Sequence, residues 1–210
     1  MSKVLETMKD NYVFAVIRGK DEEDAYEISK ASIAGGIKNI ELTFSTPNAE
    51  EVIQKVAEEY KEDETVVVGA GTVMSIDMAE KALDAGAEFL VSPHFSEEIA
   101  KFANEHDVYY MPGCGTVTEI VGAMDVGCEI IKVFPGGILG SGFIKDVHGP
   151  IPEAQLMPSG GVSIDNVVEW RENGAVAVGV GSALSRNVEA EGYESVTEVA
   201  KQFISVLEEE

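Results

Sequence analysis

Eight short runs rich in β-branched residues are the feature of this sequence that most restricts its fold. Each run is followed by an amphipathic stretch, and the centres of neighbouring runs lie about 20 to 27 positions apart, which is the room that a strand, a loop and a three-turn helix need in a parallel βα repeat. Eight consecutive βα units predict an α/β fold, a closed (β/α)8 TIM barrel, with an open doubly wound sheet as the alternative. The predicted strands are Val13–Ile17, Asn39–Thr43, Val66–Gly69, Phe89–Ser92, Val108–Met111, Ile130–Phe134, Gln155–Pro158 and Val176–Val180.

The whole chain, residues 1–210, is predicted to be one domain, because no linker or shift in composition divides it and its length suits a single core. A short helix over Val4–Asn11 would precede the barrel, and Tyr193–Glu208 would be its last helix. Cap-like residues open several other helical patterns: Thr46 with Pro47, Ser75, Ser96 and Ser163.

The charge of the chain disfavours two classes of partner. With 38 acidic and 15 basic residues, the net charge of -23 repels a nucleic-acid backbone and an anionic membrane surface. The first residues do not form a cationic, apolar signal segment, so we expect a cytoplasmic location. Cys114 and Cys128 have neither disulfide nor zinc spacing, and we expect two free buried thiols.

In a barrel of this kind, catalytic groups lie at the carboxyl ends of the strands. Lys132 is an unusual residue for such a strand, because the strand period of two puts its charged side chain on the same face as the apolar Ile130 and Phe134. If that face lines the interior, burial favours the neutral amine, which attacks a ketone to form a Schiff base. The residues that the sequence places at strand ends are Arg18, Glu41, Thr43, Thr72, Pro93, His94, Pro112, Lys132, Phe134, Ser159 and Ser182.

Glu41 is the second charged residue predicted to face inward, together with Asn39 and Thr43. A carboxylate in this position can relay protons for a Schiff base. The alternative is that Glu41 and Lys132 form a buried structural ion pair, although such pairs seldom add much stability. A predicted phosphate site on neighbouring loops favours the catalytic interpretation.

That phosphate site is predicted from two glycine loops. Ser159, Gly160 and Gly161 follow the seventh strand, and Gly181 and Ser182 follow the eighth, which are the strands whose loops usually bind phosphate in this fold. Glycines let backbone N–H groups approach phosphate oxygens, and the N-terminus of a following helix would add its positive dipole end. The alternative is that these glycines only cap helices.

Other motifs bear on the ligand. In Gly69-Ala70-Gly71-Thr72 no third glycine completes a dinucleotide fingerprint, so a nicotinamide site is rejected. Thr72 can instead bind a substrate carboxylate, with an ordinary tight turn as the alternative. The guanidinium group of Arg18 is suited to bind a carboxylate or phosphate of a ligand. The alternative is that Arg18 forms a surface salt bridge. No histidine or carboxylate spacing suggests a metal ion, so we expect no metal.

Six motifs follow one another in the chain: Ile40-Glu41-Leu42-Thr43, Gly69-Ala70-Gly71-Thr72-Val73, Ser92-Pro93, Met111-Pro112-Gly113, Ile131-Lys132-Val133-Phe134-Pro135 and Pro158-Ser159-Gly160-Gly161-Val162. With these motifs, the chain between about Val13 and Leu184 resembles the 2-keto-3-deoxy-6-phosphogluconate (KDPG) and 4-hydroxy-2-oxoglutarate (KHG) aldolase family. The resemblance implies a class I aldolase without metal or cofactor, usually a homotrimer, that acts in the Entner-Doudoroff or a related sugar-acid pathway. Its substrate would be a phosphorylated keto-deoxy sugar acid, and pyruvate and glyceraldehyde 3-phosphate would be its products.

The resemblance also assigns roles to residues. Lys132 matches the Schiff-base lysine and Glu41 the general acid and base, while Thr72 matches a group that holds the pyruvyl carboxylate. Phe134 and Pro93 would line the pocket, and Gly160, Gly161, Gly181 and Ser182 match the phosphate site. Some members have an arginine where this chain has Ser45, so the choice between the gluconate and galactonate epimers stays open, as does KHG cleavage.

Two alternative interpretations place the protein in other functional classes. A phosphosugar isomerase or a phosphate-binding synthase would share the glycine loops but would not need an imine-forming lysine. A noncatalytic barrel that binds an anionic sugar acid would be stabilised by its ligand without releasing pyruvate.

Overall fold

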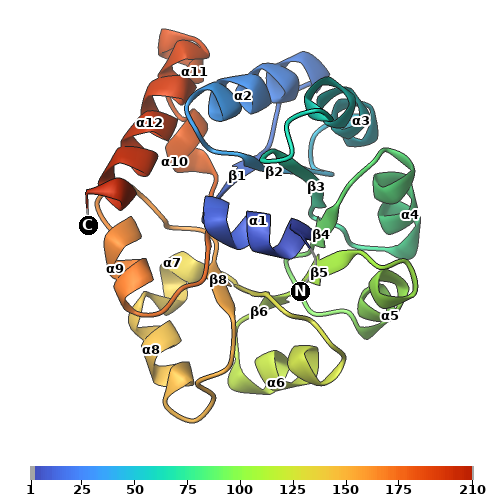
Figure 1. Ribbon diagram of the computed structural model, residues 1–210, viewed down its shortest axis with the longest axis vertical. Helices are drawn as coiled ribbons and strands as arrows, with labels where there is room; N and C mark the ends of the chain where they lie inside the picture. The colour runs from blue at the N-terminus through green and yellow to red at the C-terminus, as the bar shows by residue number, and fades with distance from the viewer. Residues whose placement is uncertain (1–2, 210) are drawn as a thin grey trace.

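The computed structural model describes residues 3–209, in which parallel strands occupy the centre and helices form a ring around them (Figure 1). The strands are β1 (Val13–Ile17), β2 (Asn39–Thr43), β3 (Val67–Gly71), β4 (Phe89–Val91), β5 (Tyr109–Met111), β6 (Gly113–Cys114), β7 (Ile131–Val133), β8 (Leu156–Pro158) and β9 (Val178–Val180). The helices are α1 (Lys3–Asn11), α2 (Glu22–Ala34), α3 (Ala49–Tyr60), α4 (Ile76–Asp84), α5 (Glu97–Glu105), α6 (Val117–Asp125), α7 (Gly136–Leu139), α8 (Gly142–His148), α9 (Val167–Glu172), α10 (Ser182–Ser185), α11 (Val188–Glu191) and α12 (Glu194–Glu208).

The α/β class predicted from the alternating pattern is confirmed, and every strand pairing within the described residues is parallel. Hydrogen bonds join the strands into a curled six-stranded sheet, in the order β5-β4-β3-β2-β1-β9, and a three-stranded sheet, β6-β7-β8. The predicted single closed barrel is therefore not confirmed, since the largest continuous sheet has six strands.

Pro112 separates β5, which corresponds to the predicted fifth strand Val108–Met111, from β6, a short strand that was not predicted. Proline has no backbone N–H to donate to a sheet, so the hydrogen-bonded run stops after Met111 and resumes at Gly113 as β6. The carbonyl of Pro112 still accepts a hydrogen bond from the Lys132 amide at 2.9 Å. On the other side, β8 and β9 meet through a single parallel bridge between Ser159 and Gly179.

The strand period of two separates the side chains into two cores. Residues such as Ala15, Leu42 and Ile131 pack outward against the helices. Inward residues such as Phe14, Phe89 and Ile130 form a second cluster, in which the rings of Phe14 and Phe89 meet edge to face at 5.4 Å. The predicted inward face of the lysine strand is confirmed, because Ile131 and Val133 belong to the outer core and Ile130 to the inner one.

Helix α1 lies across the amino-terminal ends of the strands (Figure 1). Its Leu5 and Met8 are fully buried in the inner cluster. The side-chain amide of Asn39, the first residue of β2, donates to the Met8 carbonyl at 2.8 Å and thereby fixes the end of the helix. The predicted lead-in helix thus closes one end of the strands and leaves their carboxyl ends open.

Two of the four predicted helix caps are confirmed. The hydroxyls of Ser75 and Ser96 accept hydrogen bonds from backbone amides in the first turns of α4 and α5. The other two predictions were wrong: Thr46 accepts instead from the Gly19 amide, and α9 begins after Asn166, whose side chain accepts from the Ser163 amide.

None of the helices within residues 3–209 is long and apolar enough to cross a bilayer.

Candidate active site

Most of the predicted site residues lie just beyond the carboxyl ends of the strands, the edge at which parallel α/β sheets bind ligands, and Glu41 and Lys132 lie within strands. This arrangement follows from the parallel strand order, which brings the ends of strands distant in sequence to one side of the sheet. Arg18 follows β1, Glu41 lies in β2, Thr72 follows β3, Pro93 follows β4, Lys132 lies in β7, Phe134 follows β7, Ser159, Gly160 and Gly161 follow β8, and Gly181 and Ser182 follow β9.

Lys132 and Glu41 meet in the interior although 91 residues separate them in the chain. The lysine Nζ lies 3.5 Å from Oε1 of Glu41, and both side chains are almost completely buried. The other carboxylate oxygen, Oε2, is buried without a hydrogen-bond partner among the described residues. A buried acceptor that no protein donor reaches, beside a primary amine, can accept a hydrogen bond from a ligand hydroxyl.

Gly71, the last residue of β3, leaves the space that Glu41 occupies. β2 and β3 pair in parallel with Thr43 opposite Gly71, so the Glu41 side chain folds over the glycine. A β-carbon at Gly71 would overlap Oε1 and would come within 2.7 Å of Cγ of Glu41. The sequence analysis did not single out Gly71 for this reason.

Phe134 connects the ion pair to a second part of the site. Its ring centroid lies 5.5 Å from Nζ of Lys132, within the range of a cation–π interaction. The same side chain also lines a cavity of about 220 Å³. Phe134 therefore lies between the amine and this cavity.

The cavity brings together seven of the predicted residues. Both glycine loops and the first strand contribute to its wall, and so does Phe134. The hydroxyls of Ser159 and Ser182 have no hydrogen-bond partner within residues 3–209. The seven residues are Arg18, Phe134, Ser159, Gly160, Gly161, Gly181 and Ser182.

The glycines are needed for the geometry of the cavity wall. Gly160 and Gly161 have φ of +87° and +77°, and a β-carbon on Gly161 would lie 2.6 Å from Cα of Gly137 in the loop after β7. The expected contribution of helix dipoles is small, because α9 begins only at Val167, and α10, which begins at Ser182 on the cavity wall, has four residues. Positive charge at the cavity comes from side chains instead.

Thr72 and Pro93 do not line this cavity. Thr72 is half-buried with φ of +55°, an unusual conformation for a β-branched residue, directly after the glycine that supports Glu41. Pro93 is half-buried and its backbone packs against Gly113. Both stand at the rim of the neighbouring strands β3 and β4.

Arg186 is a residue of the cavity that the sequence analysis missed. It directly follows α10 and lines the cavity with Arg18. Its position four residues after Ser182, in the segment after the last predicted strand, was the available signal.

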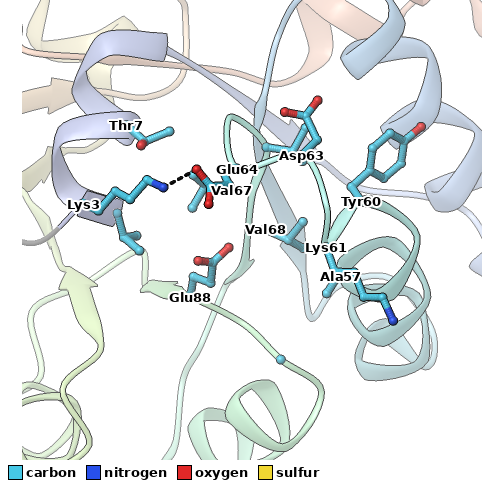
Figure 2. Close-up of a pocket in the computed structure, with 13 residues that line it drawn as sticks. Lys3, Thr7, Ala57, Tyr60, Lys61, Asp63, Glu64, Val67, Val68 and Glu88 are labelled. Atoms are coloured by element: carbon cyan, nitrogen blue, oxygen red, sulfur yellow. Dashed lines mark hydrogen bonds and ion pairs between the residues drawn. The ribbon is translucent and has the colours of Figure 1, made fainter.

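A larger cavity, of about 380 Å³, lies at the opposite ends of the strands, between α1 and the start of β3 (Figure 2). Lys3 and Glu64 form an ion pair across it, and partial burial raises the pKa of the Glu88 carboxyl. Its wall mixes charges of both signs and contains none of the predicted site residues. We therefore place the candidate active site at the carboxyl ends of the strands.

A sequence profile of the KDPG and KHG aldolases matches residues 4–199. The chain belongs to this family. As an aldolase of this type, the protein is a carbon–carbon lyase.

Two relatives match the aldolase over nearly its full length. A 2-dehydro-3-deoxy-phosphogluconate aldolase from Treponema pallidum is 30% identical over 99% of each chain. The KHG/KDPG aldolase from Escherichia coli K12 is 32% identical over 91% of this chain and 90% of the relative.

Solved structures give the same result for the aldolase fold. The native KDPGal structure superposes with a TM-score of 0.86, at 26% identity over 94% of each chain. The KDPG aldolase from Legionella pneumophila, which holds pyruvate as a covalent carbinolamine captured at low pH, superposes with a TM-score of 0.83, at 25% identity over 96% of this chain and 97% of that one.

Proposed function

We propose that this aldolase cleaves KDPG to pyruvate and glyceraldehyde 3-phosphate through a Schiff base on Lys132. The observation that carries the proposal is the buried lysine 3.5 Å from Glu41, with Phe134 between the amine and an arginine-lined cavity. The carbinolamine in the Legionella relative is the chemistry expected of such an amine with a keto acid.

The proposed reaction begins at Lys132. Lys132 first gives a proton to Glu41, and its neutral amine then attacks the C2 ketone of the substrate. Glu41 returns the proton as the carbinolamine loses water, which gives a protonated imine. The positive imine nitrogen accepts the electron pair of the C3–C4 bond when that bond breaks, which releases glyceraldehyde 3-phosphate and leaves an enamine of pyruvate. Hydrolysis of the imine then frees pyruvate and the amine.

Glu41 moves the protons in this proposal. Its carboxylate takes the C4 hydroxyl proton, directly or through a water molecule, and later protonates the enamine at C3. The unpartnered Oε2 supports this role, because it leaves one carboxylate oxygen available to a substrate hydroxyl or a water molecule while Oε1 remains near Lys132.

The remaining site residues bind the substrate in this proposal. The cavity beside Phe134 takes the phosphate, with Arg18, the loop N–H groups and the hydroxyls of Ser159 and Ser182 as donors. Thr72 and Pro93 border the pyruvyl end. Phosphate bound at a distance from C3–C4 orients this bond, so a substrate without phosphate loses turnover as well as affinity.

The test of the function is pyruvate release, followed with lactate dehydrogenase and NADH, on KDPG, its galactonate epimer, KHG and the unphosphorylated sugar acids. We expect cleavage of a phosphorylated substrate, and the preferred epimer identifies the pathway. Borohydride added with pyruvate should leave a mass adduct on Lys132. Ligand-induced stabilisation without pyruvate release would instead support the noncatalytic barrel, and turnover that is insensitive to borohydride would support an enzyme without an imine.

We also propose that the two sheets together form one closed (β/α)8 barrel and a single domain. The inner cluster supports closure, because it contains residues of β1, β3, β4, β5 and β8 together with Ile130 and Ala177, which adjoin β7 and β9. The bridge between Ser159 and Gly179 and the bond from the Lys132 amide to the Pro112 carbonyl span the two breaks. The homotrimer and the cytoplasmic location stay predictions.

A further inference from the structure

Arg18 and Arg186 reach the same cavity from different parts of the chain. Arg18 follows β1, and Arg186 follows the single turn of α10. A β-carbon at Gly181 would lie 3.2 Å from Nη1 of Arg18, so the absence of a side chain there lets the guanidinium lie against the loop after β9. Two of the three arginines in the chain therefore line one cavity of about 220 Å³.

Neither arginine is engaged by an acidic side chain. Within residues 3–209 no ion pair includes Arg18 or Arg186, whereas nine lysines form ion pairs. Acids outnumber bases 38 to 15 in this chain, so an exposed cation readily finds a carboxylate. Two unpaired guanidinium groups at one cavity are consequently a local positive site on a molecule whose net charge is -23.

The chemistry of this site fits a dianion better than a carboxylate. A guanidinium donates two parallel hydrogen bonds to a phosphate, and two guanidinium groups can engage different pairs of its three free oxygens. The unpartnered hydroxyls of Ser159 and Ser182 stand on the same wall and can donate to the remaining lone pairs. A substrate that ends in a single carboxylate offers two oxygens and half the charge.

We propose that Arg186 is a specificity-determining residue which, with Arg18, clamps the substrate phosphate and makes the enzyme prefer phosphorylated over unphosphorylated keto acids. This inference rests on the proposed aldolase function and adds to it the residue that sets the preference. Arg18 follows β1, which pairs with the Glu41 strand β2, whereas Arg186 follows α10 and in this proposal meets only the phosphate end of the substrate.

The test compares Arg186→Ala and Arg186→Lys with wild type on two reactions. The first is cleavage of the phosphorylated substrate, and the second is C3 proton exchange of pyruvate, which has no phosphate. Loss of a charged hydrogen-bond pair predicts a kcat/KM about 10- to 100-fold lower for cleavage in Arg186→Ala. Arg186→Lys should recover part of it. The exchange rate should change less than about twofold, so the ratio of the two reactions is the readout.

Lys61→Ala is the matched control, because it also removes one positive charge but from the opposite end of the strands, where Lys61 pairs with Glu58. It should leave both reactions unchanged. An equal loss of cleavage and exchange in Arg186→Ala would overturn the proposal by indicating a general structural role, and an unchanged kcat/KM for cleavage would overturn it as well.

Inorganic phosphate separates this inference from the proposed function. By titration calorimetry, wild type should bind phosphate more tightly than Arg186→Ala by about tenfold or more, and high salt should reduce the difference. This result is expected even if the enzyme cleaves neither epimer, in which case the proposed function fails and the anion site stands. Equal phosphate affinity of the two proteins would refute the clamp whatever the enzyme cleaves.

Discussion

Oε1 of Glu41 lies 3.5 Å from Nζ of Lys132, and neither side chain is more than 4% exposed. The pair joins β2 to β7, which belong to different hydrogen-bonded sheets. A charged pair at this depth needs both partners, because each desolvated charge is offset only by the other. In the proposed mechanism, the same contact places the nucleophile next to the group that moves protons.

Removal of one charge should therefore destabilise the fold. Lys132→Met leaves the Glu41 carboxylate buried without a cation, and we expect a loss of about 3 to 5 kcal/mol in the free energy of unfolding at pH 7. The double variant Lys132→Met with Glu41→Gln should recover much of this loss. Urea unfolding followed by circular dichroism measures both values.

The exposed pair between Lys61 and Glu58 provides the comparison. Lys61→Met should change the free energy of unfolding by less than about 1 kcal/mol, because water screens that pair. If Lys132→Met costs no more than Lys61→Met, the buried pair does not carry opposite charges in the folded protein.

Glu41→Gln should separate imine formation from proton transfer. The amide cannot take or return a proton, so we expect cleavage to slow by about 100-fold or more. Borohydride with pyruvate should still label Lys132. Deuterium exchange at C3 of pyruvate, followed by NMR in D2O, should be slow, and exchange at the wild-type rate would remove Glu41 from the proposed mechanism.

Gly71→Ala should reduce activity by moving Glu41. The added β-carbon would overlap the Glu41 carboxylate, so we expect a kcat at least about tenfold lower and a destabilisation of about 1 to 3 kcal/mol. The adduct on Lys132 should still form. Gly142→Ala is the control, since no atom lies within 4 Å of a β-carbon there, and it should leave kcat unchanged. Wild-type kcat in Gly71→Ala would show that the Glu41 position is not critical.

The two cysteines should resist thiol reagents in the folded protein. Burial raises the pKa of Cys114 and of Cys128 to about 12, so few thiolates exist at pH 8. Ellman's reagent should react slowly with the native protein. In urea it should react rapidly with two thiols per chain. Because the folded pKa values lie above the unfolded value of about 8.5, stability from these groups is present below about pH 8.5 and falls as pH rises toward 12. Fast native labelling would contradict this.

The prediction that both cysteines are free, buried thiols is confirmed in part. The described residues contain both cysteines as free thiols, with Cys114 buried and Cys128 half-buried. Spacing in the sequence excluded common disulfide and zinc motifs, but the depth of each side chain depends on the packing of α6 and β6.

Part of the fold could be predicted from the sequence because it depends on local periodicity. Alternation in Ile130 to Phe134 placed Lys132 on the inner face, and the same rule placed Glu41, since neighbouring residues in a strand point to opposite sides. The predicted fifth strand ended at Met111, just before Pro112, in agreement with β5, whereas β6 is too short to show a periodic pattern and was not predicted.

Arg186 and Gly71 show what local patterns do not reveal. Arg186 resembles any surface arginine in its own segment, and only the position of α10 beside the loop after β8 makes it part of the cavity. Gly71 belongs to a motif considered as a tight turn, whereas its lack of a side chain matters because Glu41 from the adjacent strand occupies the space.

The sequence by itself determined the alternation of strands and helices, the inward face of Lys132 and Glu41, and the two glycine loops, because each depends on neighbours in the chain. Only the tertiary structure decided that Lys132 and Glu41 lie 3.5 Å apart, that Oε2 is unpartnered and that two unpaired arginines share a cavity. These are distances between segments far apart in the sequence, and they are set by how the strands curl and pack.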